Sequence, residues 1–103
     1  METIRIDVGV YTALSIDLSG FDFTGIEKVI WTVKNFADDS EPVLIRREYT
    51  ESKVYNEIIM PEESRLLKGE PVYDFIQVMI DGSCYKVGDN GRIVLSKGVG
   101  ECP

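Results

Sequence analysis

The sequence contains no histidine and only two cysteines, so two side chains that are widely used in catalysis and metal binding are absent or scarce. Histidine is the commonest general base and the commonest transition-metal ligand. Its absence excludes most hydrolase arrangements. Cys84 and Cys102 have no spacing typical of a metal site. A bridge between them is geometrically feasible if the end of the chain folds back, whereas a reducing compartment would keep both as thiols.

Basic residues and long apolar runs are also lacking. Eleven Lys and Arg stand against 18 Asp and Glu, which gives a net charge of −7. The densest basic grouping is Arg46-Arg47, which is too small for a phosphate track, so we predict no nucleic-acid binding. No segment approaches the ~20 apolar residues that span a bilayer, and the first residues do not resemble a secretory signal. We therefore expect no membrane partner and cytoplasmic synthesis.

What is present is the composition of a folded domain. Apolar residues make up 44% and charged residues 28% of a chain of 103 residues, which suffices for one domain but not two. We predict a single domain over residues 1–103. Two glycines and a terminal proline after residue 97 predict a loose tail from about that position.

The segment 72–88 is the predicted centre of the fold. Asp81-Gly82 is a strong hairpin signal between two strand-like segments. Both faces of the first segment are largely apolar, which is typical of a strand in the middle of a sheet. On one face lie Ile76, Val78 and Ile80, and on the other Tyr73, Phe75 and Met79.

Period-two patterns predict the other strands. Residues 4–18 alternate over a length that exceeds an ordinary strand, so we expect a break near Gly9 and a switch between sheets. Trp31 is the expected core anchor, and Arg47 breaks the apolar face of its strand, which suits a protected edge. The further predicted strands cover residues 26–36, 43–49, 54–60 and 92–96, and a short helix is expected near 61–68. Together they predict an all-β, Ig-like Greek-key antiparallel β-sandwich of seven to eight strands.

Residues 67–73, Leu-Lys-Gly-Glu-Pro-Val-Tyr, resemble the tyrosine corner of Greek-key sandwiches. The resemblance implies that Tyr73 hydrogen-bonds back across the arch that precedes it. The Cys…Trp…Cys framework of true immunoglobulin domains is missing, so an Ig-like topology is implied and antibody-type membership is not.

The whole chain is similar to small β-sandwich domains of phage and prophage structural modules, such as the amino-terminal domains of phage baseplate upper proteins. The similarity lies in Phe23-Thr24-Gly25 before an alternating strand, the helix ending at 67–69, Tyr73-Asp74-Phe75, and the closing segment 91–95. It implies a non-enzymatic structural or assembly component of a tail or baseplate that is associated with a virion. The implied partners are further copies of the chain or other phage structural proteins.

No catalytic, cofactor-binding or metal-binding residues are predicted, and no cofactor is expected. Cys84 has only Lys86 as a nearby cation, so an unreactive thiol is favoured over a nucleophile. The segment 38–41 offers hard oxygens for calcium but lacks the spacing of an EF-hand, which favours a solvated loop. Residues 88–91 precede no helix, so they predict a turn and not a phosphate-binding loop.

The candidate interface consists of Tyr73, Phe75, Met79 and Tyr85. These side chains would form an exposed apolar surface if Ile76, Val78 and Ile80 filled the core. In the alternative, they are themselves core residues or are covered by a neighbouring segment. A different class of function, a carbohydrate- or surface-binding module, would use loop aromatics, namely Phe21, Phe23 or Tyr55.

Overall fold

The computed structural model describes residues 2–97, and these form eight strands and one short helix. The elements are β1 (Ile4–Val8), β2 (Thr12–Asp17), β3 (Ile26–Lys34), β4 (Ile45–Tyr49), β5 (Val54–Ile59), α1 (Pro61–Ser64), β6 (Val72–Met79), β7 (Cys84–Lys86) and β8 (Gly91–Lys97). The predicted all-β, sandwich-like fold is confirmed. The predicted tail beyond β8, with Cys102, lies outside the described residues.

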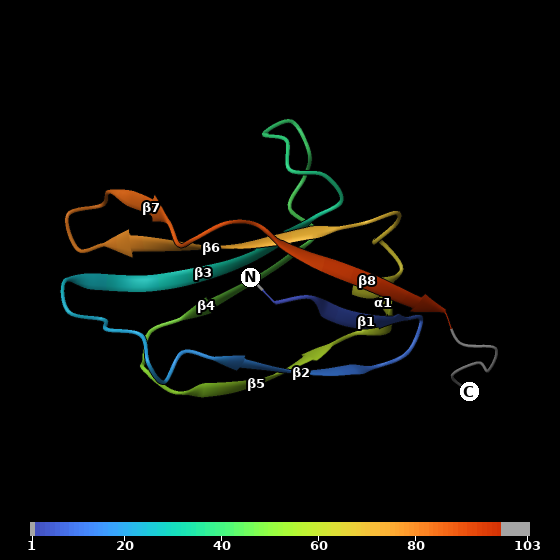
Figure 1. Cartoon of the computed structure of the whole chain (residues 1–103), viewed down its shortest axis with the longest axis horizontal. Helices are drawn as coiled ribbons and strands as arrows, with labels where there is room; N and C mark the ends of the chain where they lie inside the picture. The colour runs from blue at the N-terminus through green and yellow to red at the C-terminus, as the bar shows by residue number, and fades with distance from the viewer. Residues whose placement is uncertain (1, 98–103) are drawn as a thin grey trace.

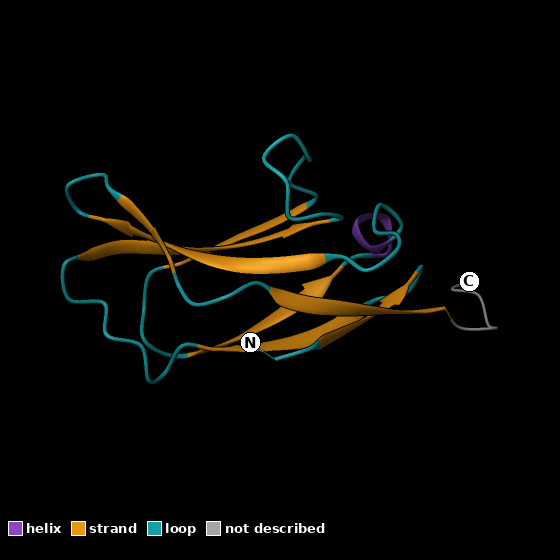
Figure 2. Cartoon of the chain, turned by 45° about the horizontal axis from the view of Figure 1, so that its top comes forward, coloured by secondary structure: helices purple, strands orange, loops and turns teal. Residues whose placement is uncertain are grey.

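The strands form two layers (Figures 1 and 2). The larger sheet has the order β1-β8-β6-β3-β4, with β7 also paired to β6, and the smaller sheet contains β2 and β5. The prediction of a wholly antiparallel sandwich is wrong for one pair of strands, because β1 and β8 are parallel. These two strands lie at opposite ends of the described chain, so no tight turn joins them and forces opposite directions.

The predicted break near Gly9 is confirmed. The chain leaves the larger sheet after β1 and enters the smaller sheet at β2. Gly9 has a φ of 83°, a conformation that other residues rarely adopt, and its N–H donates to the Ser64 hydroxyl at 2.9 Å. The bond to Ser64 fixes this corner against the helix.

The hairpin of β6 and β7 is also confirmed, and β6 is central, with β3 on one side and β7 and β8 on the other. The turn contains Gly82 at a φ of 92°, and the Asp81 carboxylate accepts the N–H of Ser83 at 2.9 Å. Trp31 is fully buried at the middle of β3. It is surrounded by the buried apolar side chains of both sheets, which include Ile6, Ile16, Val29, Val33, Ile45, Tyr49, Ile59, Tyr73 and Ile93.

The helix is shorter than the predicted 61–68. After Ser64 the chain tightens into turns in which Leu66 N–H donates to Glu63 O at 3.2 Å and Leu67 N–H donates to Ser64 O at 3.1 Å. Pro61 occupies the first position of the helix, and the Glu63 carboxylate accepts the Met60 N–H at 3.1 Å, so both residues stabilise its start. Within residues 2–97 no helix has the length and apolar character that crossing a membrane requires.

Candidate protein interaction groove

An apolar groove of about 450 Å³ opens between the two sheets, and we call it the β2 groove. Its lining comes from the start of β1, the second half of β2 and the first half of β6. The lining residues are Glu2, Ile4, Ser15, Ile16, Asp17, Tyr73 and Phe75. The site therefore joins residues that lie up to 73 positions apart in the sequence, from Glu2 to Phe75.

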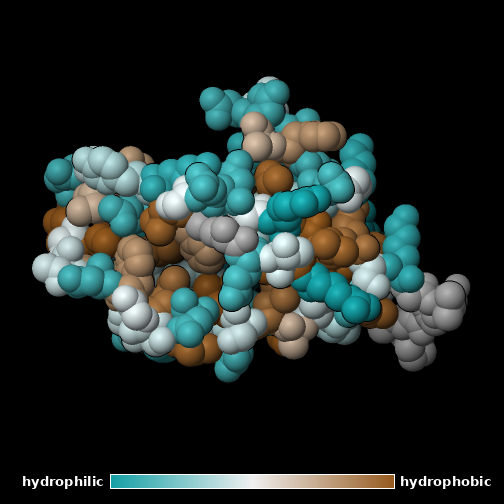
Figure 3. All heavy atoms as spheres, viewed as in Figure 1, coloured by the Kyte–Doolittle hydropathy of each residue, from teal (hydrophilic) through white to brown (hydrophobic). Residues whose placement is uncertain are grey.

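The groove is open because this side of the sandwich is only half covered. β1 and β8 pair over residues 4–8 and 93–97, and they cover one half of it (Figure 1). In the smaller sheet β2 pairs only with β5, so no described strand pairs with its other edge, and residues of β2 and β6 line the groove together. Figure 3 shows apolar atoms at the surface there, between the line of β6 and the line of β2.

The floor of the groove is set by the pairing of β6 with β3. Tyr73 lies opposite Val33, and Phe75 lies opposite the core residue Trp31. Side chains directly opposite each other share a face, so Tyr73 and Phe75 point inward. The rings of Tyr73 and Phe75 meet edge to face with centroids 6.0 Å apart. Tyr73 is 4% exposed, while Phe75 is only partly buried and packs against the edge of the core.

Tyr73 does not make the bond that the tyrosine-corner resemblance implies. Its hydroxyl donates to the carbonyl of Glu2, which precedes β1, and not to the preceding arch. Gly91 of β8 lies against the ring, and a Cβ there would be 2.1 Å from Tyr73 Cζ. Burial, together with the nearby Glu2 carboxylate, raises the pKa of Tyr73 above its ordinary value. This tyrosine therefore anchors the N-terminal segment at the groove.

The other two predicted interface residues lie outside the β2 groove. Met79 ends β6 and is partly buried, whereas Tyr85 of β7, opposite Gln77, is 56% exposed. On the opposite face of β6, Ile76 and Val78 are partly buried on the outside of the sandwich. The predicted surface is therefore divided: Tyr73 belongs to the core, Phe75 to the groove, and Tyr85 to an exposed hairpin.

The edge of β2 beside the groove has no strand partner among residues 2–97. β2 pairs only with β5, in an uninterrupted antiparallel register from Thr12 opposite Ile59 to Asp17 opposite Val54. The backbone N–H and C=O groups on the far side of β2 are therefore available for pairing. Sequence patterning placed β2 as a strand but gave no sign of which edge stays free.

The charged groups of the groove are both acidic. Glu2 and Asp17 line it, and none of the lining residues within 2–97 is Lys or Arg. The Asp17 carboxylate accepts the Ser19 N–H at 2.9 Å and the Ser19 hydroxyl at 2.5 Å. The hydroxyl bond, followed by the N–H bond, lowers the pKa of Asp17. The carboxylate is therefore ionised at neutral pH.

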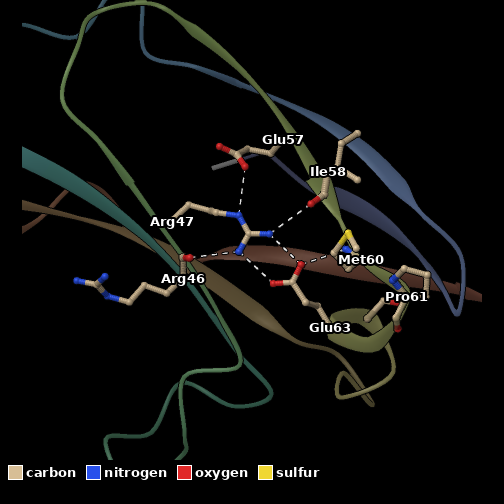
Figure 4. Close-up of polar contacts among 8 residues, drawn as sticks. Arg46, Arg47, Glu57, Ile58, Met60, Pro61 and Glu63 are labelled. Carbon is tan, nitrogen blue, oxygen red and sulfur yellow. Dashed lines mark hydrogen bonds and ion pairs between the residues drawn. The ribbon is translucent and has the colours of Figure 1, made fainter.

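The opposite side of the sandwich is closed by an ion cluster centred on Arg47 of β4 (Figure 4). Its guanidinium donates to Glu63 at 2.9 and 3.0 Å, to Glu57 at 3.1 Å and to the Ile58 carbonyl at 3.3 Å. The ion pair with Glu63 lowers the pKa of that carboxyl. The predicted inward charge on an edge strand is confirmed, but its partners on β5 and α1 were not recognisable from the sequence.

The acidic loop considered for calcium forms internal hydrogen bonds instead. The Asp38 carboxylate accepts the N–H and the hydroxyl of Ser40, both at 2.9 Å. Asp38 and Asp39 border a polar cavity of about 240 Å³ on the outer face of β3 and β6, together with Lys34 and Lys86. Among residues 2–97 no group of three or more Cys, Asp or Glu side chains is arranged to hold a metal ion.

The aromatic residues considered for carbohydrate binding are partly buried. Phe21 and Phe23 meet edge to face at 5.1 Å and pack against the core. Tyr55 packs against Tyr49 with ring centroids 4.4 Å apart. All three therefore use part of their ring surface within the fold.

Comparison with known proteins gave no match to any family model, curated protein or solved structure. The β2 groove is thus characterised by its own geometry, namely an apolar floor, an acidic rim and an unpaired strand edge. Cys84 is exposed and forms no disulfide among the described residues.

Proposed function

We propose that this chain is a non-enzymatic structural or assembly domain of a phage or prophage particle, associated with the tail or baseplate, that acts through protein–protein contacts. The observation that carries the proposal is the β2 groove, where an apolar floor lies beside an unpaired strand edge. The phage assignment comes from the resemblance of the sequence to baseplate β-sandwich domains. Its partners would be neighbouring particle proteins or further copies of the chain.

The character of the groove favours a protein over a small ligand. Contiguous apolar surface beside polar residues is typical of protein interfaces. A stable interface buries about 800 Å² on each partner. That is roughly one-eighth of the 6487 Å² of accessible surface of this chain, so the groove would form the centre of such an interface. Its surroundings, including the exposed residues of β2, would form the rim.

The proposal is tested by co-expressing the chain with the products of its flanking genes and measuring the mass of the purified complex by light scattering. Two variants of equal charge identify the surface. Ser15→Lys adds a cation on β2 at a residue of the groove lining, and Asn56→Lys adds one directly opposite it on β5, at a residue outside that lining. We expect a complex with wild type and with Asn56→Lys, and at least tenfold weaker assembly with Ser15→Lys, about 1.4 kcal/mol.

Either of two results would overturn the proposal. They are a mass of one 11.6 kDa chain at high micromolar concentration with every neighbouring product, and specific binding on a glycan array. The last result would favour a carbohydrate- or surface-binding module.

A further inference from the structure

Resting on the proposed assembly function, we propose that the β2 groove receives an extended segment of a different protein, which adds to the free edge of β2 as a third strand of the smaller sheet. Its alternate apolar side chains enter the groove, and its Lys or Arg side chains meet the acidic rim. Binding by strand addition obtains affinity from main-chain hydrogen bonds and specificity from pockets for every second side chain.

The first support is that the edge of β2 has few of the devices that usually protect a strand edge. Exposed edges are commonly blunted by charged residues, above all lysine, by proline or by a bulge. β2 contains no Lys, Arg or Pro, its one charged residue is Asp17 at its end, and its register is uninterrupted. On the other side of the sandwich, Arg47 of β4 points inward and donates to the Ile58 carbonyl of β5 at 3.3 Å. The charged side chain that hinders pairing at a strand edge thus lies on the side of the sandwich opposite the β2 groove.

The second support is the size and position of the groove. An apolar cavity of about 150 Å³ accommodates a benzene ring, so the 450 Å³ here is large enough for two aliphatic side chains. Residues i and i+2 of a strand point to the same side, about 6.6 Å apart. Ile16 of β2 and Phe75 of β6 both line the groove. A strand added to β2 would therefore direct alternate side chains into this space.

The third support is charge. Glu2 and Asp17 are the charged residues of the lining, and the chain as a whole carries −7. A basic segment is attracted to this rim, and a second copy of the same acidic chain is repelled. The occupant is therefore a different protein.

The test uses the full chain and three synthetic eight-residue peptides with blocked ends. One alternates lysine and valine, one alternates glutamate and valine, and one has the composition of the first with lysines and valines in pairs. Affinity is measured by fluorescence anisotropy, and strand addition by amide hydrogen exchange at β2. We expect the alternating lysine–valine peptide to bind at least tenfold tighter than the other two and to slow exchange in residues 12–17.

The variants Ser15→Lys and Asn56→Lys are the matched pair here as well, since both side chains are exposed. Ser15→Lys should lower the affinity for the alternating lysine–valine peptide fivefold or more, and Asn56→Lys should lower it less than twofold. Equal binding of the glutamate peptide, or protection that falls on β1 or β4 instead of β2, would overturn the inference. If a flanking-gene product binds without protecting β2, strand addition fails while the assembly function stands. If no protein binds at all, the assembly function itself fails.

Discussion

Replacing Arg47 by methionine tests whether the ion cluster closes the sandwich. Arg47 makes a two-bond contact to Glu63, at 2.9 and 3.0 Å, and one bond to Glu57, at 3.1 Å. The three side chains are 19 to 24% exposed. Breaking a buried pair costs about 3 to 5 kcal/mol, and breaking a surface pair about 0 to 1. For this partly buried cluster we expect a loss of about 2 to 3 kcal/mol.

The loss in free energy of unfolding is measured by urea unfolding monitored through tryptophan fluorescence. Trp31 reports on it because it is the only tryptophan and is fully buried. Arg46→Met is the matched control, since the neighbouring Arg46 is exposed and pairs with Glu48 at 2.9 Å. It should cost less than about 1 kcal/mol. Neutralising Glu57 and Glu63 together in the Arg47→Met background should recover at least half of the loss, because no unpaired carboxylates remain.

The pH dependence of the free energy of unfolding tests the stabilising effect of the Arg47–Glu63 ion pair independently. Arg47 lowers the pKa of Glu63 in the folded state, so the stabilisation is complete above the ordinary glutamate pKa of 4.5 and is lost as the pH falls through the lowered value. The difference between wild type and Arg47→Met should therefore be constant near neutral pH and shrink below about pH 4.5. Equal losses for Arg47→Met and Arg46→Met, or a difference that grows in acid, would refute this role.

Three further outcomes are expected. Gly91→Ala should lower the free energy of unfolding in urea by at least about 1 to 3 kcal/mol, because its Cβ would lie 2.1 Å from the Tyr73 ring. Gly20→Ala is the control, since its Cβ would have nothing within 4 Å, and it should change the free energy of unfolding by less than about 1 kcal/mol. Tyr73→Phe should cost about 0.5 to 1.5 kcal/mol and speed amide exchange at the start of β1, since the bond to Glu2 is lost; faster exchange confined to the arch at 67–71 would contradict this. Cys84 is exposed, so it should react with a thiol reagent in the folded chain when the other cysteine is replaced. A reaction as slow as that of a buried thiol would contradict the exposed position of Cys84.

The sequence by itself determined the layer structure and the central elements. Alternation along β3 identified Trp31 as a core residue, and Asp81-Gly82 identified the hairpin of β6 and β7. The break at Gly9 and the inward charge of Arg47 were also predictable, because each interrupts a period-two pattern at a definite residue. These features depend on local backbone geometry and on the alternation of side chains, which the order of residues specifies directly.

Tertiary structure alone decided which apolar face of β6 is inside, which group accepts the hydrogen bond of the Tyr73 hydroxyl, and that the unpaired edge of β2 lies beside a groove. Both faces of β6 are apolar, so only its register with β3 selects Tyr73 and Phe75 for the interior. The bond from Tyr73 to Glu2 and the pairing of β1 with β8 join residues that are far apart in the sequence. Such contacts depend on how the two sheets pack, and periodicity within one strand carries no information about the strand's neighbours in space. The β2 groove is a product of that packing.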